Sequence, residues 1–254
     1  MKKLITLLTI TLFSLTSFSQ PYQWQWAKAS GGNKVTLGLG GTYSATNYLE
    51  EVVSLKNTSD NNTYLLSHIK PGNTNFGGLP ITTYSGGVST SGTNILLAKV
   101  DCEGNYIWHK TFGGASENEA RSMEIDNLDN VYVSMNVHNT GMESGFDVYP
   151  NYFQLPFHFD TDTIMNPVPR TPGNGYINPN FQSPAHKKLA LIKYNNSGEF
   201  QWLRMPQSDL VTYSTNIAVD YGIYVESNGT IHWMVGLGTG NHLNGQLQVS
   251  VNQL

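Results

Sequence analysis

Short apolar runs separated by polar turns recur along the chain and predict paired β-strands. Apolar residues dominate Ile95–Val100 and Leu189–Tyr194, and a polar segment follows each run, DCEGN from Asp101 and NNSGE from Asn195. Glycine accepts positive φ, and Asp or Asn can bond its own backbone, so both segments predict tight turns. Each turn leads into a second strand that carries a tryptophan. The basic unit is therefore expected to be strand, turn, strand.

This unit occurs more than once. Shifts of 94 residues toward the C-terminus and 82 residues toward the N-terminus superimpose the middle copy on two others. The residues that define the copies are Trp26, Trp108 and Trp202, Lys99 and Lys193, Gly104 and Gly198, and Gly113 and Gly114, which coincide with Gly31 and Gly32. Self-similarity of this kind predicts a repeat architecture. Because the tryptophans recur at equivalent positions, packing between copies explains them better than stacking on a ligand.

Further segments with apolar or alternating patterns predict the other strands. They are Tyr48–Leu55, Thr63–His68, Ala120–Asp126, Val131–Val137, two strands around the polar turn at 226–230, and Gln246–Val251. After the N-terminal segment, no amphipathic helix is visible. The sequence therefore predicts an all-β protein.

Residues 1–19 are expected to be a secretory signal peptide. Lys2 and Lys3 precede the apolar stretch Leu4–Phe13, which is too short to span a bilayer. The small residues Ser17 and Ser19 predict cleavage before Gln20; a retained anchor is the alternative. No later segment is apolar enough to cross a membrane. The mature chain, residues 20–254, is expected to form one repeat domain.

A proline-rich insert interrupts the repeats at about residues 139–188. Its seven prolines exclude central strands and helices, although Phe157–Asp160 could form one edge strand. A loop of this length is either functional or loosely ordered.

Composition limits the possible functions. Charged residues make up 13% of the chain, against roughly 25% in an average soluble protein. The net charge of −4 gives no basic surface, so nucleic-acid binding is not expected. Cys102 is the single cysteine, which excludes an internal disulfide. It follows a strand in a turn, where a thiol is more often incidental than catalytic.

Several acidic pairs could carry chemistry, and each has a simpler explanation. The segment Asp126–Asn130 could form a calcium loop, but an ordinary turn is favoured because the third copy does not keep the ligands. Asp160 and Asp162 could bind a cation, although such pairs in a proline-rich segment are more often solvated. Glu117 and Glu119, beside Arg121, could act in glycoside hydrolysis; alternating charges there more often face water.

Histidine does not point to a metal site either. The seven histidines are scattered, and no pair has the spacing of zinc ligands: His68, His109, His138, His158, His186, His232 and His242. The sequence thus predicts no catalytic residue, cofactor or bound metal.

The repeated residues resemble the secreted bacterial β-propeller repeat family found in Bacteroidetes-type surface proteins. The matching pattern is ILLAKVD from Ile95, Gly104-Asn105, Trp108, Gly113-Gly114 and SMEID from Ser122. The resemblance implies antiparallel four-stranded blades and export to the cell surface, and it carries no active-site pattern. Blades usually take about 40 to 50 residues, in rings of about 4 to 8. The spacing here predicts an incomplete ring of about 2.5–3 blades, as in a piece of a larger propeller.

The expected function is non-catalytic binding or scaffolding at the bacterial surface, with an unknown protein or glycan as partner. The aromatic residues of the insert that could contact this ligand are Tyr149, Tyr152, Phe153 and Tyr176. Two alternatives remain: a polysaccharide-active enzyme, lyase or glycosidase, on a propeller scaffold, and a structural segment of a larger adhesin. Acidic, His or Tyr side chains converging at one end of the sheets would favour the enzyme.

Overall fold

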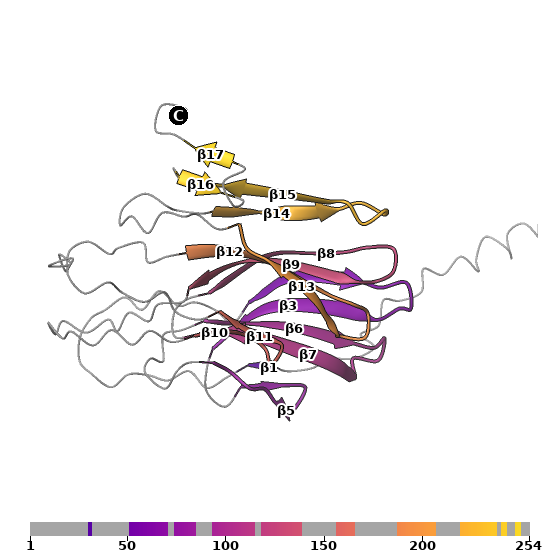
Figure 1. Cartoon of the computed structure of the whole chain (residues 1–254). Helices are drawn as coiled ribbons and strands as arrows, with labels where there is room; N and C mark the ends of the chain where they lie inside the picture. Colours follow the sequence, from indigo (N-terminus) through magenta and orange to yellow (C-terminus); the bar gives the residue numbers. More distant parts are fainter. Residues whose placement is uncertain are drawn as a thin grey trace, which may run out of the picture.

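The fold is all-β and antiparallel, as expected. The computed structural model describes residues 30–31, 51–70, 74–84, 93–114, 118–138, 156–165, 187–206, 219–237, 240–242 and 247–249. Within these ranges every regular element is a β-strand, and each hydrogen-bonded pair of strands is antiparallel (Figure 1). No described helix has the length and apolar character needed to cross a bilayer.

Two sheets form the centre of the structure. The strands of the larger one are β2 (Val52–Asn57), β3 (Thr63–Ile69), β6 (Asn94–Val100), β7 (Tyr106–Gly113), β10 (Phe157–Phe159) and β11 (Thr163–Met165). Those of the smaller one are β8 (Glu119–Ile125), β9 (Val131–His138), β12 (Lys187–Tyr194) and β13 (Phe200–Arg204). The spatial orders are β11-β10-β7-β6-β3-β2 and β13-β12-β9-β8. Each sheet thus contains four strands that run back and forth in chain order.

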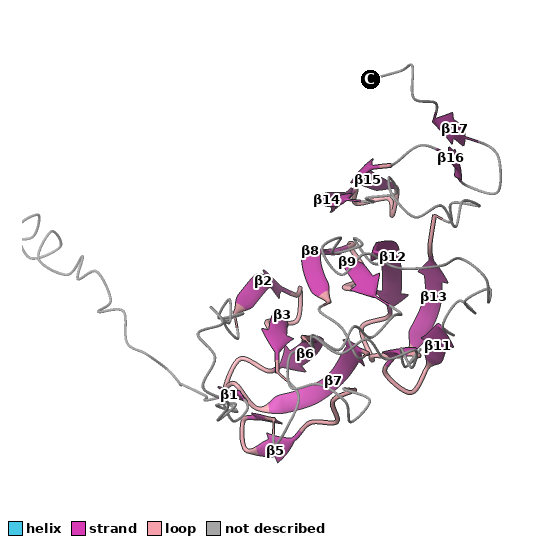
Figure 2. Cartoon of the chain, turned by 90° about the vertical axis from the view of Figure 1, so that its left-hand side faces the viewer, coloured by secondary structure: helices cyan, strands magenta, loops and turns pink. Residues whose placement is uncertain are grey.

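Shorter elements flank the two sheets. On one side lies a three-stranded sheet, and on the other lies the hairpin β14–β15 (Figure 1). The bounds of the short strands are β1 (Ser30–Gly31), β4 (Asn75–Phe76), β5 (Leu79–Pro80), β14 (Val219–Val225), β15 (Ile231–Gly236), β16 (Gly240–His242) and β17 (Leu247–Val249). Figure 2, turned by 90°, shows β8, β9, β12 and β13 following one another across the smaller sheet.

Apolar side chains fill the spaces between the layers. The largest cluster lies between the six-stranded and four-stranded sheets and includes Leu97 and Phe112 from one and Val133 and Ile192 from the other. A second cluster joins β6 to Phe76 of β4, and a third joins the four-stranded sheet to β14–β15. Strand β6 is buried along its whole length. This accounts for its continuous apolar sequence, because a strand covered on both faces has no solvent-facing positions.

The insert departs from the expected single edge strand. Phe157–Phe159 does form a strand, but it pairs with β7 on one side and with β11 on the other. A two-stranded extension of the large sheet replaces the expected edge strand, and β11 is the outer strand. Pro156 precedes the hairpin and none of residues 157–165 is a proline, so every residue of the hairpin can donate a backbone hydrogen bond.

Five turns at one end of the strands share one geometry. In each, the first residue donates its N–H to the carbonyl of the fifth, and the fourth donates to the carbonyl of the first. The fourth residues all have positive φ: Asn61, Gly104, Asp129, Gly198 and Gly229. These are three-residue hairpin loops. The positive φ expected for the glycines of DCEGN and NNSGE is thus confirmed.

Candidate functional site

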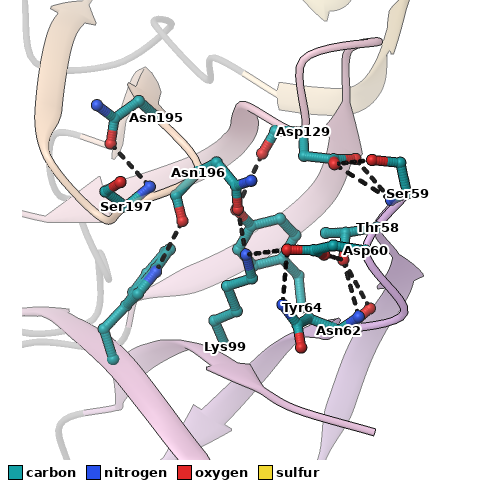
Figure 3. A network of polar contacts seen from close by, with 11 residues as sticks. Thr58, Ser59, Asp60, Asn62, Tyr64, Lys99, Asp129, Asn195, Asn196 and Ser197 are labelled. Carbon is teal, nitrogen blue, oxygen red and sulfur yellow. Dashed lines mark hydrogen bonds and ion pairs between the residues drawn. The ribbon is translucent and has the colours of Figure 1, made fainter.

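A buried lysine lies at the centre of a polar network where three of the turns meet (Figure 3). Lys99, on β6, is 3% exposed. Its Nζ donates to Oδ1 of Asn196, lies 3.6 Å from the Asp60 carboxylate and is 5.4 Å from the ring centre of Tyr64. Burying a cation is unfavourable unless it is paired and hydrogen-bonded. These neighbours provide that compensation.

Tyr64 links the same network to the next sheet. Its hydroxyl donates to the carbonyl oxygen of Asp129 at 2.9 Å and lies 3.3 Å from Oδ1 of Asn196. Burial, followed by the nearby Asp129 carboxylate, raises the pKa of Tyr64. The phenol therefore stays neutral and acts as a donor, which is a structural role.

The turn between β12 and β13 covers the tryptophan of the neighbouring sheet. The Trp108 indole Nε1 donates to the backbone carbonyl of Asn196 at 3.1 Å. Gly198 lies against the same indole: a Cβ at this position would be 2.8 Å from Cδ2 of Trp108. Close approach to Trp108, together with positive φ, accounts for the glycine in this turn.

The four-stranded sheet has the same residue types at matching positions. Trp202 lies opposite Lys193 in the register, as Trp108 lies opposite Lys99. Nζ of Lys193 is 4.7 Å from the ring centre of Tyr132, whose ring is 6.0 Å from that of Trp202. Lysine, tyrosine and tryptophan therefore form one group in each sheet.

Asp126 is held by protein donors, as favoured for an ordinary turn. Its carboxylate accepts hydrogen bonds from the backbone of Leu128 and Asn130 and from the Tyr132 hydroxyl, and Lys193 lies 3.5 Å away. Burial alone would raise the pKa of Asp126, but the hydrogen bonds, led by the Asn130 side chain, outweigh it and lower the pKa. Asp129 accepts bonds from Ser59. The Asp126 carboxylate thus holds its own turn and pairs with Lys193 of β12, whereas Asp129 joins its turn to the one that carries Ser59.

The two aspartates of the D-x-D pair in the insert form ion pairs with one lysine. Nζ of Lys110 lies 3.3 Å from the Asp160 carboxylate and 3.0 Å from that of Asp162. The buried hydroxyl of Tyr194 donates to Asp162 at 3.0 Å. Burial, with Asp162 as the next cause, raises the pKa of Tyr194. Asp160 is half-buried and Asp162 lies in an exposed turn, but both carboxylates pair with Lys110 and so attach the β10–β11 hairpin to the sheets.

Two aromatic residues adjoin this cluster. Tyr84 stacks on the His158 ring with centroids 4.3 Å apart. Burial raises the pKa of Tyr84, with Asp160 as a further cause, and burial lowers the pKa of His158. Near neutral pH both groups are therefore uncharged.

The other acidic residues, the histidines and Cys102 do not gather at one site within the described residues. Glu119 pairs with Arg121 on β8, and Glu117 lies outside the described residues. The described histidine contacts are separate: His68 with Glu51, His109 with Tyr106, and His232 with Glu226. Within the described ranges, no three His, Cys, Asp or Glu side chains are placed to hold a metal. Cys102 is exposed in its turn.

The repeated glycines have different surroundings. Gly104 is buried in its turn with φ of 76°. At Gly113 a Cβ would overlap the Asn94 side chain, whose amide bonds the backbone of Tyr84. Gly114 follows and is also buried. The candidates that fall outside the described residues are Trp26, Tyr149, Tyr152, Phe153 and Tyr176.

Sequence reasoning missed the tyrosines of the network. Tyr64 and Tyr132 each stand six residues after the first residue of a turn, Thr58 or Asp126. A shift of 68 residues superimposes these two turns, and that signal could have been found. Asn196 gives no comparable signal, because its role depends on contact with another sheet.

Comparison with known proteins does not assign a family. No protein-family model matches the chain. No curated protein matches it significantly.

Proposed function

We propose that this chain is an exported, β-propeller-like repeat protein that binds or scaffolds at the bacterial cell surface without catalysing a reaction. The observation that carries the proposal is the matched Lys–Tyr–Trp group of two successive sheets, Lys99 with Trp108 and Lys193 with Trp202. A repeated packing group is expected when each sheet is one blade and its neighbour covers it.

The pairing of short strands supports the repeat. Gly31 of β1 pairs with Asn75 of the hairpin β4–β5, and Gly113 of β7 pairs with His158 of the hairpin β10–β11. Gly31 and Gly113 are 82 residues apart, the same spacing that relates Trp26 to Trp108. In the proposed architecture, β1 is thus the last strand of a further blade, with its own small hairpin.

The two ends of the strands differ in character, which suggests where a partner binds. The five short turns lie at one end, where those at residues 58–62, 126–130 and 195–199 meet around Lys99 and Tyr64. The connections from β3 to β6, from β9 to β12 and from β13 to β14 all start at the opposite end. Long connections held by a rigid scaffold are the usual place for binding residues. We therefore assign the binding surface to this end, with Tyr149, Tyr152, Phe153 and Tyr176 as contacts.

A polysaccharide-active enzyme is the second candidate, and one cluster favours it. Asp160, Asp162 and Tyr194 converge with Lys110, and these are residue types that glycosidases and lyases use. However, one lysine pairs with both carboxylates, and the raised pKa of Tyr194 makes it a poor base. Hairpin attachment explains the cluster better than proton transfer does.

A glycan array probed with residues 20–254 tests the binding function. We expect binding that Tyr152→Ala weakens at least tenfold, while Tyr106→Ala, a partly exposed tyrosine on β7, leaves it unchanged. The same preparation is incubated with acidic and neutral polysaccharides, and new reducing ends and unsaturated products are measured. Turnover that Asp162→Asn abolishes would replace the binding function with the enzymatic one.

A further inference from the structure

Three buried oxygen atoms without hydrogen-bond partners occur on the facing surfaces of the four-stranded sheet and the β14–β15 hairpin. They are Oγ of Ser134, Oδ1 of Asn136 and Oδ2 of Asp220. Their residues are 0%, 1% and 3% exposed. A buried polar atom with no partner is strongly unfavourable, above all on a carboxylate. Three of them in one layer call for a common explanation.

Strand alternation places the two β9 residues on the surface that faces the hairpin. Val133 and Met135 point toward the six-stranded sheet, whereas Tyr132 belongs to the cluster shared with β14–β15. Because successive side chains point to opposite faces, Ser134 and Asn136 lie on the same face as Tyr132.

Asp220 lies on the opposing surface of the hairpin. Its Oδ1 accepts bonds from the Gly222 N–H at 2.8 Å and from the Trp233 indole at 3.1 Å, which leaves Oδ2 without a donor. A Cβ on Gly222 would be 3.5 Å from Cβ of Ser122, which lies opposite Ser134 in the register. The β14 end that carries Asp220 therefore lies over this part of the sheet.

The contact between the six-stranded and four-stranded sheets has residues at equivalent positions, and there the polar groups are hydrogen-bonded. Counted from the first residue of each turn, Asn136 matches His68 and Asp220 matches Ala120. There the Ala120 N–H donates to Nε2 of His68 at 2.9 Å. Leu66, which matches Ser134, packs in the apolar core together with Ala120. One hydrogen bond and an apolar contact therefore join the two large sheets at these positions. Between the four-stranded sheet and the hairpin, the equivalent positions carry oxygen atoms without partners.

We propose that Ser134, Asn136 and Asp220 form a site for a hard cation of the calcium type, which joins the β14–β15 hairpin to the four-stranded sheet. A hydroxyl, an amide carbonyl and a carboxylate are the oxygen ligands such ions take. Glu119, which pairs with Arg121, accepts a bond from Asn136 Nδ2 at 3.3 Å and so fixes the orientation of the Asn136 amide. With one carboxylate as direct ligand, the affinity belongs to the weak range of extracellular modules, about 10⁻⁴–10⁻³ M.

Terbium luminescence tests this site, because the Trp233 indole donates to Asp220 and can pass its excitation to a bound lanthanide. Terbium should give tryptophan-sensitised emission that calcium displaces. Asp220→Asn, which keeps the shape and removes the charge, should abolish it, whereas Glu226→Gln on the same hairpin should not. Trp233→Phe should lose the emission and still bind calcium by calorimetry.

Thermal unfolding supplies an independent readout of the same site. For wild-type protein, Tm should rise by roughly 3–6 °C for each tenfold increase in calcium above Kd. If Asp220→Asn does not fold, Ser134→Ala should weaken calcium binding severalfold and keep the fold. The proposal is overturned if calcium leaves Tm and emission unchanged, as when the oxygens are hydrated by water alone. It is equally overturned if Asp220→Asn and Ser134→Ala bind calcium like wild type.

Discussion

Lys99 shows how single residues hold neighbouring sheets together. It sits on a fully buried strand, yet the groups that compensate its charge, Asp60 and Asn196, come from turns on two different sheets. Removing one partner of such a group costs more than the pair contributes, because the other charge stays buried. Residues of this kind fix which surfaces meet.

Asp126 gives the first prediction at this scale. Its pKa in the folded protein lies below the unfolded value of about 3.8, so its stabilising contribution is complete above that value. The contribution is lost as pH falls through the folded pKa. Asp126→Asn should lower the free energy of unfolding by about 1–3 kcal/mol at pH 7. Urea titrations should show the difference shrinking toward pH 3, and a constant difference across this range would contradict the prediction.

Trp108 gives the second prediction at the residue scale. Trp108→Ala removes a large apolar side chain and one hydrogen bond, so the free energy of unfolding should fall by about 3–5 kcal/mol. Trp108→Phe keeps most of the packing against Tyr64 and loses the bond to Asn196, so about 1–2 kcal/mol is expected. Denaturant unfolding of both variants separates the contribution of ring packing from that of the indole hydrogen bond. Equal losses would mean that the indole N–H matters more than the ring.

At the scale of strands and turns, the sequence predicted what depends on neighbours in the chain. The turns from Asp101 and Asn195 could be predicted, because their side chains bond their own backbone. The β10–β11 hairpin was mistaken for a single edge strand, because its partner β7 lies about 45 residues earlier in the chain. The pairing of Lys110 with Asp160 was equally hidden, since it exists only after that strand has docked.

Substitutions at two glycines in equivalent turns can distinguish the cost of local backbone strain from the cost of a clash between sheets. Gly198 and Gly229 have φ of 81° and 84°, but only Gly198 lies against another side chain, Trp108. Gly229→Ala should cost about 1–2 kcal/mol from backbone strain alone. Gly198→Ala should cost about 1–3 kcal/mol more, because its Cβ meets the indole. Chemical unfolding of both variants gives the difference, and equal costs would show that the indole moves aside freely.

The whole molecule consists of layers, each of which buries its faces against the layers beside it. Apolar clusters lie on both sides of the six-stranded sheet and on both sides of the four-stranded sheet. In such stacks, stability is close to a sum of layer and interface contributions.

The proposed export of the chain can be tested at the scale of the whole molecule. Expression of residues 1–254 in a bacterium with a Sec pathway should release a protein that begins at Gln20, because Ser17 and Ser19 are suited to the signal peptidase. Mass spectrometry of the exported fraction measures the new N-terminus. Replacing Leu7 and Leu8 with Arg should keep the full-length protein inside the cell. An uncleaved N-terminus in the exported wild-type protein would contradict the predicted signal peptide.

The bond between Trp108 and Asn196 joins residues 88 positions apart. A ribosome that adds about 5–20 residues per second needs roughly 4–18 s to make the intervening chain. If strands β2 to β7 pair during that interval, Trp108 lies without the turn that covers it. We therefore expect newly made chains to need chaperones that keep them unfolded until export, and a stall between codons 114 and 195 to cause aggregation.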